Sequence, residues 1–334
     1  MEEYLNLFID KENPTFLEKY CKTKTLQRLK NVTQFCGCDY TNLYHPKFLY
    51  TRFNHSLVVA HMTWHFTHDK VETIAALLHD VGTPCFAHAI DFLLGDSIKQ
   101  ESSEQDIVTV IQKDNELRNY LQEDGISLQK LKNFKHFPIL ENHSPRLCTD
   151  RLDGVLHTCY IWLQTHSLEE IKEVYDDIVV LQNEEGNKEI GFRHFNQALK
   201  FANMVKVYAI ELQGNRDKYV MNYISEILKK AIAQNILQLS DLYQKKESDI
   251  INILNQNYSS WHKFTKATEI ISTDQLPNQF YVSIASKKRN VIPLIKNNKI
   301  EKRITEYKQA QKIYQTIEKF QAEKYGYIPE IKKL

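Results

Sequence analysis

One stretch of the chain, 77-LLHDVGTPCFAHAIDFL-93, restricts what this sequence can fold into. It is apolar enough to be buried, yet it carries an imidazole beside a carboxylate at His79 and Asp80, and a second such pair at His88 and Asp91. Burying ionisable groups is costly unless they are paired, hydrogen-bonded or bound to a metal ion. The fold must therefore bring partners for these groups from elsewhere in the chain.

The remaining pattern favours helices, because only 9 Gly and 8 Pro interrupt 334 residues. Apolar periodicity predicts helices over 15–34, 53–69, 71–82, 86–95, 103–112, 148–165, 194–213, 217–243 and 300–325. Two β-type runs flanking Glu-Gly-Asn predict a hairpin over 178–192, and two short strands are expected around a basic turn over 279–295. We expect an all-α (mainly α) helical bundle with small β-hairpins. Its predicted parts are an N-terminal segment (1–20), a main domain (21–245) and a C-terminal helical lobe with short strands (246–334).

The charge balance, 43 basic against 42 acidic residues, argues against a protein built mainly to hold nucleic acid. No apolar run reaches the ~20 residues that cross a membrane, and the acidic start lacks the pattern of a signal peptide. The six cysteines contain no CxxC pair and are expected to be reduced thiols, with Cys36-Gly37-Cys38 forming a turn. We therefore expect a soluble cytoplasmic protein.

Four ionisable residues, which lie in three separate apolar segments, are candidate metal ligands. They are His55 in 52-RFNHSLVVAHM-62, His79, Asp80, and Asp150 in 147-LCTDRLDGVLH-157. Imidazole and carboxylate together suit a first-row transition metal, so the set predicts one divalent ion: Mn, Fe, Co, Ni or Zn. Mg could accompany a phosphate substrate.

Other polar clusters admit more than one interpretation. His61, His65 and His68 share one helix face, which is either a second metal stripe or a solvated or partly buried face. His136 and His143 lie in a predicted loop, where they are loop residues or ligands of a second metal. The run 287-KKR-289 is either a solvated turn or a contact for a nucleotide phosphate.

The order of these motifs resembles the HD-domain metal-dependent phosphohydrolases. Over residues 20–160 the chain carries 52-RFNHSL-57, 76-ALLHDVG-82 followed by Pro84, Phe86 and His88, and 150-DRLD-153, preceded by 26-LQRLKNVTQF-35. The segment 286-SKKRNVIPLI-295 is similar to a family segment near the C-terminus. Within this family the chain looks most like the deoxynucleoside triphosphate triphosphohydrolases, including the SAM-and-HD-domain type.

The resemblance implies an HD-domain helical bundle and a role for each matching residue. His55, His79, Asp80 and Asp150 would bind the metal, Arg52 would hold a substrate phosphate, and Arg151 would stand near the phosphates. His88 and Asp91 would assist proton transfer, and Gln34 would lie near the sugar. The implied activity is nucleotide hydrolysis by metal-activated water, first of all the release of inorganic triphosphate from a dNTP. The family also assembles into symmetric oligomers, so a homo-oligomer is expected.

The chain departs from the family pattern at four places. Thr83 replaces a histidine, Gly154 a tyrosine and Thr158 an aspartate, and 99-KQESSEQD-106 offers only Glu101 and Glu104 where the triphosphohydrolases have a His-Glu pair. The predicted metal site keeps the pattern, whereas the sugar pocket and the proton relay differ. Alternative functions are hydrolysis of another nucleotide or phosphate ester, as in an HD phosphatase or phosphodiesterase, and non-catalytic regulation through a bound metal or nucleotide. An HD-type oxygenase on a di-iron site is a further alternative.

Overall fold

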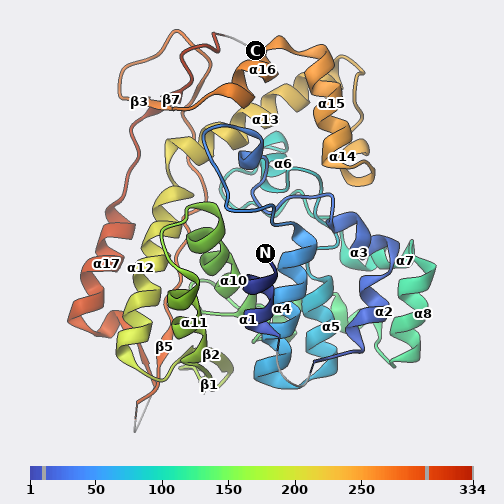
Figure 1. Cartoon of the computed structure of the whole chain (residues 1–334), viewed down its shortest axis with the longest axis vertical. Helices are drawn as coiled ribbons and strands as arrows, with labels where there is room; N and C mark the ends of the chain where they lie inside the picture. Colours follow the sequence, from blue (N-terminus) through green and yellow to red (C-terminus); the bar gives the residue numbers. More distant parts are fainter. Residues whose placement is uncertain (10–12, 298–300, 333–334) are drawn as a thin grey trace.

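The computed structural model describes residues 1–9, 13–297 and 301–332, and it confirms a mainly α fold (Figure 1). The helices are α1 (Glu2–Phe8), α2 (Leu17–Cys21), α3 (Lys24–Leu29), α4 (Arg52–Thr67), α5 (Lys70–Leu78), α6 (His88–Leu93), α7 (Ile107–Gln112), α8 (Asn115–Glu123), α9 (Leu128–Leu131), α10 (Thr149–His157), α11 (Leu168–Asp176), α12 (Phe195–Glu211), α13 (Asn215–Ala233), α14 (Asp241–Gln244), α15 (Glu247–Asn257), α16 (Ser259–Lys266) and α17 (Lys308–Lys319). Short 3-10 turns lie at Cys38–Tyr40, Phe134–His136 and Ile304–Glu306, and a π-helical turn follows α10 at Thr158–Trp162.

The strands that the structure describes form two small sheets. The first has the order β1 (Ile178–Gln182), β2 (Lys188–Phe192), β5 (Leu294–Ile295), β6 (Lys302–Arg303), and the second has the order β3 (Ile271–Thr273), β7 (Tyr325–Tyr327), β4 (Tyr281–Val282). The predicted hairpin is confirmed, because β1 and β2 pair antiparallel from Ile178 opposite Phe192 onward. The two strands expected over 279–295 exist as β4 and β5 but belong to different sheets, so the basic segment between them is not a hairpin turn.

The helix pair α4–α5 positions three of the four predicted metal ligands, His55 on α4 and the His79–Asp80 pair just after α5. Thr51 caps α4 by accepting from the backbone of Asn54, whose side chain accepts from the Thr51 backbone in return. His68 then takes the left-handed conformation that ends α4, and Asp69 caps α5 through the backbone N–H groups of Val71 and Glu72. Helix α5 ends at Leu78 and not at 82 as predicted, so the His-Asp pair lies on the turn that follows it.

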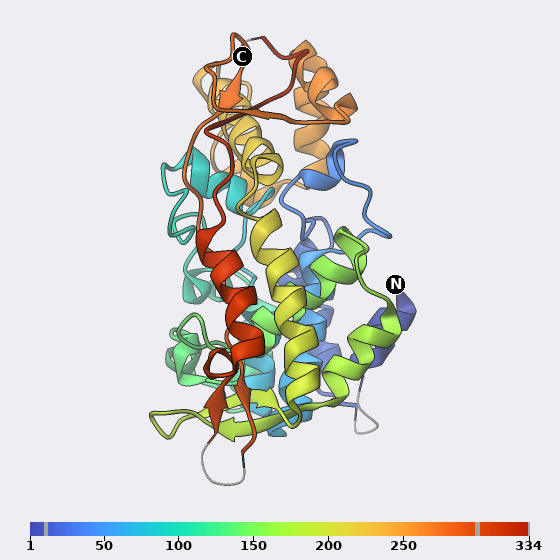
Figure 2. The same ribbon diagram turned by 90° about the vertical axis from the view of Figure 1, so that its left-hand side faces the viewer.

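Segments from the C-terminal third pack back onto the helical core. Helix α13 crosses α6, and α17 lies along α12 (Figure 2), while β5 and β6 extend the sheet begun by β1 and β2. The predicted division at 1–20, 21–245 and 246–334 stays a prediction. No helix among residues 1–9, 13–297 and 301–332 is long and apolar enough to cross a membrane.

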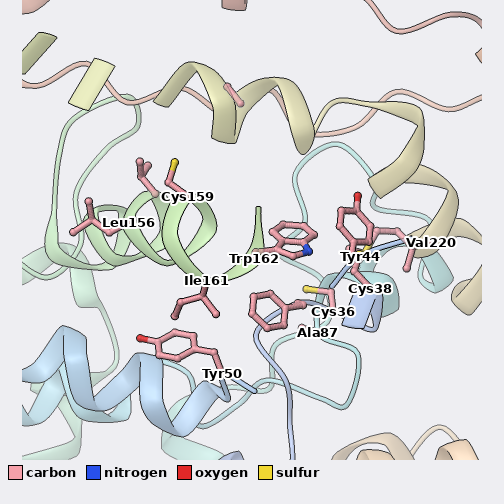
Figure 3. Packing of buried hydrophobic residues seen from close by; sticks show 14 of the residues in the cluster. Cys36, Cys38, Tyr44, Tyr50, Ala87, Leu156, Cys159, Ile161, Trp162 and Val220 are labelled. Carbon is pink, nitrogen blue, oxygen red and sulfur yellow. The ribbon is translucent and has the colours of Figure 1, made fainter. Parts of the chain in front are cut away.

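The buried side chains form two clusters. The larger one joins α1, α6, α10, α12 and α13 with the C-terminal segments, and the smaller one lies beneath α4, α5 and α7–α9. Figure 3 shows Trp162 beside Tyr44 in the larger cluster, and their ring centroids are 5.0 Å apart.

All six cysteines are free thiols, as expected. The predicted turn between Cys36 and Cys38 depends on Gly37, whose φ of 94° suits glycine and whose Cβ would lie 2.3 Å from Ile224 Cδ1.

Candidate metal centre and cavity

The four predicted metal ligands meet at one point. Helix α4 supplies His55, the turn after α5 supplies His79 and Asp80, and the first turn of α10 supplies Asp150. His55 Nε2 lies 3.3 Å from His79 Nε2, 3.1 Å from Asp150 Oδ1 and 3.9 Å from Asp80 Oδ2. His79 Nε2 lies 3.7 Å from Asp150 Oδ1 and 3.8 Å from Asp80 Oδ2. Residues up to 95 positions apart in the chain therefore present four ligand atoms to one another.

Both imidazoles are held by the ring nitrogen that faces away from this point. His55 Nδ1 is 2.6 Å from Asp153 Oδ2, and His79 Nδ1 is 2.7 Å from the backbone oxygen of Ala76. A proton on each Nδ1 satisfies these acceptors, so the lone pairs of the two Nε2 atoms converge. This arrangement is typical of metal-binding histidines, whose second nitrogen donates to a carboxylate or carbonyl.

Asp153 is the residue of this centre that the sequence pattern did not single out. It is fully buried and accepts hydrogen bonds from Tyr4 Oη at 2.7 Å and Tyr50 Oη at 3.0 Å as well as from His55. His157 Nδ1 lies 3.4 Å away. Burial alone would raise the pKa of Asp153, but hydrogen bonds from His157 and His55 hold it below its usual value. The carboxylate stays charged behind the candidate ligand His55.

Arg52 is hydrogen-bonded to Asp80, one of the candidate metal ligands. Its Nη1 donates to Asp80 Oδ2 at 2.8 Å, and both side chains are buried. Burial opposes ionisation of Asp80, but the charge of Arg52 lowers the pKa of this carboxyl below its usual value. Arg52 Nε is also buried and has no hydrogen-bond partner among the described residues. Arg52, the predicted phosphate-binding residue, thus lies beside the candidate metal ligands and has an N–H group free to donate a further hydrogen bond.

The chemistry of the donor set fits a divalent transition metal. Imidazole nitrogens and carboxylates are the ligand types that Mn, Fe, Co, Ni and Zn accept, and the ligand atoms of His55, His79 and Asp80 lie within 4.8 Å of one another. The other predicted stripe does not join them: no group of three possible ligands within the described residues includes His61, His65 or His68. His136 and His143 are likewise outside such groups, although His143 lines the cavity described next.

A cavity of about 500 Å³ opens from this centre. The predicted residues Gln34, Arg52, His88 and Arg151 all line it, and so does the basic run 287–289 that was expected to be either a solvated turn or a phosphate contact. Gln34 Oε1 is buried and has no partner in the described part of the chain. The cavity therefore joins the candidate metal ligands to a basic wall that comes from a distant part of the chain.

The predicted pair His88 and Asp91 is present as a hydrogen bond. His88 Nδ1 lies 2.9 Å from Asp91 Oδ2, and Ser103 N donates to Asp91 Oδ1 at 2.8 Å. Only His88 lines the cavity; Asp91 is fully buried behind it. Burial lowers the pKa of His88 to about 4, so the ring is neutral at pH 7. A neutral ring that donates from Nδ1 offers Nε2 as an acceptor.

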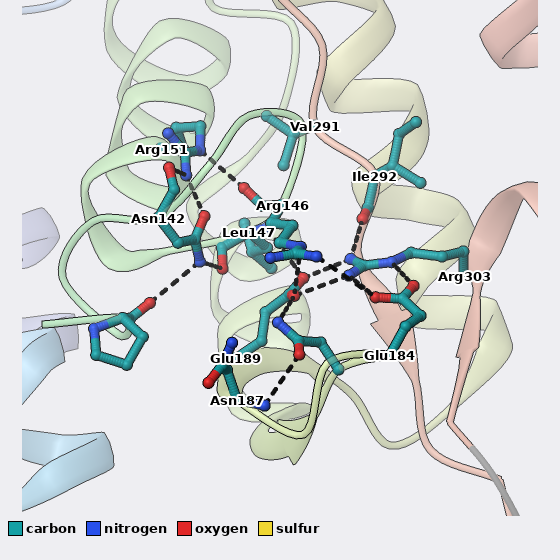
Figure 4. A network of polar contacts seen from close by, with 12 residues as sticks. Asn142, Arg146, Leu147, Arg151, Glu184, Asn187, Glu189, Val291, Ile292 and Arg303 are labelled. Atoms are coloured by element: carbon teal, nitrogen blue, oxygen red, sulfur yellow. Dashed lines mark hydrogen bonds and ion pairs between the residues drawn. The ribbon is translucent and has the colours of Figure 1, made fainter. Parts of the chain in front are cut away.

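Arg151 is occupied by the loop that leads into α10. Its Nε donates to Arg146 O at 2.8 Å, Nη1 to Glu141 Oε1 at 2.9 Å and Nη2 to Asn142 O at 2.6 Å. Figure 4 shows Arg151 against Asn142, with the buried Glu189 between Arg146 and Arg303. Through these contacts Arg151 fixes the approach to Asp150, while its side chain still borders the cavity.

A second buried carboxylate, Glu247 at the start of α15, was also missed. It accepts from Phe86 N at 2.8 Å, Thr33 N at 3.1 Å and Tyr40 Oη at 2.7 Å. Phe86 and Ala87 take positive φ angles of 61° and 42° just before His88, a conformation that side-chain-bearing residues rarely adopt. Glu247 therefore holds the strained backbone that places His88, and it also holds the residue before Gln34.

Two curated proteins are similar in sequence to the chain. YdhJ, an uncharacterised protein of Bacillus subtilis (strain 168), is 27% identical over 244 residues, which make up 71% of this chain and 70% of that protein. The metal-dependent phosphohydrolase cns2 of the fungus Cordyceps militaris is 38% identical over 86 residues, only 25% of this chain and 24% of that protein. No protein-family profile matches the chain.

Solved structures share its fold over nearly the whole length. A phosphohydrolase from Bacteroides thetaiotaomicron VPI-5482 superposes with a TM-score of 0.64 at 15% identity, covering 95% of this chain and 96% of that one. A hypothetical protein from Aquifex aeolicus gives 0.63 at 16% identity, covering 93% and 91%. The chain thus has a mainly α, HD-like fold also found in a phosphohydrolase.

Proposed function

We propose that this protein is a metal-dependent phosphohydrolase that acts on nucleotides. The observation that carries the proposal is the convergence of His55, His79, Asp80 and Asp150 at one end of a cavity, with Arg52 paired to a ligand of the set. The sequence similarity to a metal-dependent phosphohydrolase and the fold shared with another phosphohydrolase support it.

The residues lining the site would have separate roles in such a reaction. His55, His79, Asp80 and Asp150 would hold the ion; when bound, a divalent ion lowers the pKa of water and polarises a phosphoryl oxygen. Arg52 offers a planar guanidinium to the negative oxygens of the transferring phosphate. His88, neutral and oriented by Asp91, offers an acceptor atom at the cavity wall for a proton.

Release of triphosphate from a dNTP is the first substrate hypothesis, and it follows from the motif resemblance. A second candidate, another nucleotide or phosphate ester, is favoured by the wall of α10. A Cβ added at Gly154 would meet nothing within 4 Å, and Thr158 Oγ1 donates to the Gly154 carbonyl at 2.8 Å. Neither position offers a free polar group to a sugar. A regulator that binds metal and nucleotide without turnover would keep the same centre.

A product-resolved hydrolysis screen tests this proposal. Purified protein is offered Mn, Fe, Co, Ni, Zn or Mg with dNTPs, NTPs, monophosphates and cyclic nucleotides, beside Asp150→Ala and a matched control, Glu226→Ala, on the solvent side of α13. We expect phosphate or triphosphate release by the wild type and the control and none by Asp150→Ala. If a nucleotide raises the Tm of the metal-loaded protein but no product forms, the result would refute the enzyme hypothesis and favour a non-catalytic regulator. The homo-oligomer is proposed separately, and sedimentation of the same samples tests it.

A further inference from the structure

The end of the cavity away from the metal centre differs in character from the metal end. Phe35, Trp162, Leu212 and Met221 line it with apolar and aromatic surface. Phe35 and Trp162 stack at a tilt, with ring centroids 5.7 Å apart. Such a surface suits a flat, uncharged ring better than a phosphate or a flexible polyol.

The wall formed by α10 connects the two ends. Asp150, Gly154 and Thr158 are spaced four residues apart and all line the cavity, so they share one helix face. Trp162, at the end of the π-helical turn, continues this wall. At a rise of ~1.5 Å per residue, the wall from Asp150 to Trp162 extends over roughly 15–18 Å. This length holds a phosphate at one end and a ring system at the other.

A buried carboxyl, that of Asp217 in the first turn of α13, also lines the cavity. Asp217 is 5% exposed. The thiol of Cys38 contacts its Oδ1 at 3.8 Å, and no ion pair of Asp217 is found within the described ranges. A buried carboxyl that no cation neutralises is costly to keep without a purpose, and the metal centre and the proton relay do not use it.

We propose that Asp217 determines specificity by hydrogen-bonding the edge of a heterocyclic group, such as a nucleobase, that lies against the apolar surface formed by Phe35 and Trp162. The proposal rests on the proposed function, because it assigns the organic half of the nucleotide to this end of the cavity. In its neutral form the carboxyl presents one donor and one acceptor side by side. It is complementary to a ring edge that carries a donor next to an acceptor.

The surroundings of Asp217 favour the neutral form. Burial, and next the charge of Glu211 on α12, raise the pKa of Asp217 to about 8, although Arg289 from the cavity wall and Arg216 oppose this. The other titratable groups that face it are Lys218 beside it in α13 and Cys36, Cys38 and Tyr44 from the loop before α4. Burial raises the pKa of both thiols and of Tyr44, so these three groups stay neutral between pH 6 and pH 8.

Binding of nucleosides, which carry no phosphate, tests Asp217 independently of catalysis. The intact wild type, Asp217→Asn, Asp217→Leu and the control Glu226→Gln are titrated with a panel of purine and pyrimidine nucleosides by calorimetry at pH 6.5 and 9. Asparagine keeps the donor and acceptor of a neutral carboxyl, and leucine keeps only the volume. We expect Asp217→Asn and Glu226→Gln to bind the preferred nucleoside within about threefold of wild type at pH 6.5, and Asp217→Leu to lose at least about tenfold. At pH 9 wild type weakens and Asp217→Asn does not.

Two results overturn the proposal. One is equal nucleoside affinity for wild type and Asp217→Leu, and the other is no nucleoside binding by a wild type that still takes up its metal. Circular dichroism and metal titration establish that each variant is folded. The outcome for the proposed function is separate. If Asp217→Leu still hydrolyses phenyl phosphate, the proposed phosphohydrolase activity stands whatever the nucleoside result. If nucleosides bind but no substrate releases phosphate, the role of Asp217 stands and the proposed enzymatic activity is refuted.

Discussion

Replacing Asp153 by asparagine probes the residue that lies behind the proposed metal ligand His55. The carboxylate accepts from His55 Nδ1 at 2.6 Å and from the hydroxyls of Tyr4 and Tyr50 at 2.7 and 3.0 Å. Asparagine keeps the shape of the side chain and one acceptor oxygen for His55, and Tyr4 can reverse its hydroxyl toward the new amide. What the substitution removes is the charge and not the packing.

The size of the effect follows from the His55 hydrogen bond. A hydrogen bond to a charged group contributes about 1.5–3 kcal/mol, roughly twice a neutral one. Losing about half of this contribution, ~0.8–1.5 kcal/mol, lowers metal affinity about 4- to 12-fold. Asp153→Ala also leaves the ring orientation unsupported and is expected to cost up to about 100-fold.

Calorimetric titration with Mn²⁺ at pH 7.5 measures these affinities. Tyr50→Phe is the matched control, because it removes one hydrogen bond to the same oxygen and leaves the charge; we expect its affinity to stay within about threefold of wild type. Unchanged metal affinity in a folded Asp153→Ala protein would refute the view that Asp153 supports a metal-binding His55.

Three further predictions concern the cavity and its supports. Arg52→Ala should lower kcat about 10²–10³-fold, as the loss of a charge-stabilising donor does, and a rate within threefold of wild type would remove Arg52 from the reaction. Glu247→Ala leaves Phe86 N, Thr33 N and the partly buried Tyr40 hydroxyl without their acceptor, so the free energy of unfolding should fall by about 1–3 kcal/mol in urea titrations, with a smaller loss in Glu247→Gln. The pKa of Asp217, raised to about 8, makes the folded form hold a proton that the unfolded chain releases near pH 4; stability is therefore lost as pH rises from about 4 to 8. Asp217→Asn lacks this pH-dependent loss, so its Tm should rise relative to that of wild type as the pH increases from 5 to 8. Parallel Tm curves would contradict a raised pKa of Asp217.

The predicted ligand set was readable from sequence because each member breaks an apolar pattern. His55, His79, Asp80 and Asp150 stand out in buried segments, and the structure brings all four together. Asp153 breaks the pattern of the same helix, but nothing local says that its partners are Tyr4 and Tyr50, 149 and 103 residues away. The available signal was a second carboxylate three residues after the predicted ligand Asp150, in the same helix.

Glu247 and Asp217 were beyond reach for the same reason. Each looks like an ordinary charged residue in the first turn of a helix, where acidic side chains are common. Their roles depend on which loops the fold places against them, and these loops come from the first 90 residues of the chain. Long-range contacts of this kind leave no periodic trace in the sequence.

Strong periodicity located the long helices, and capping decided where they end. The predicted 53–69 and 194–213 agree with α4 and α12 to within two residues at each end. The predicted 15–34 divides into α2 and α3, 217–243 ends at Ala233, and 300–325 contracts to α17, with 300 itself outside the described residues. Helices α1, α8, α9, α11, α15 and α16 were missed; the Ser167 and Glu170 capping box of α11 was a usable signal.

The most direct test of a metal-dependent phosphohydrolase is a joint measurement of metal content and hydrolysis on one set of samples. Wild type, Asp150→Ala and Glu226→Ala are stripped with a chelator, reloaded with each divalent ion, analysed by elemental mass spectrometry and assayed with the nucleotide panel. We predict one bound ion per chain and product release that returns with the ion in wild type and Glu226→Ala, and neither in Asp150→Ala. Hydrolysis that is unaffected by stripping, or by the loss of Asp150, would contradict the account.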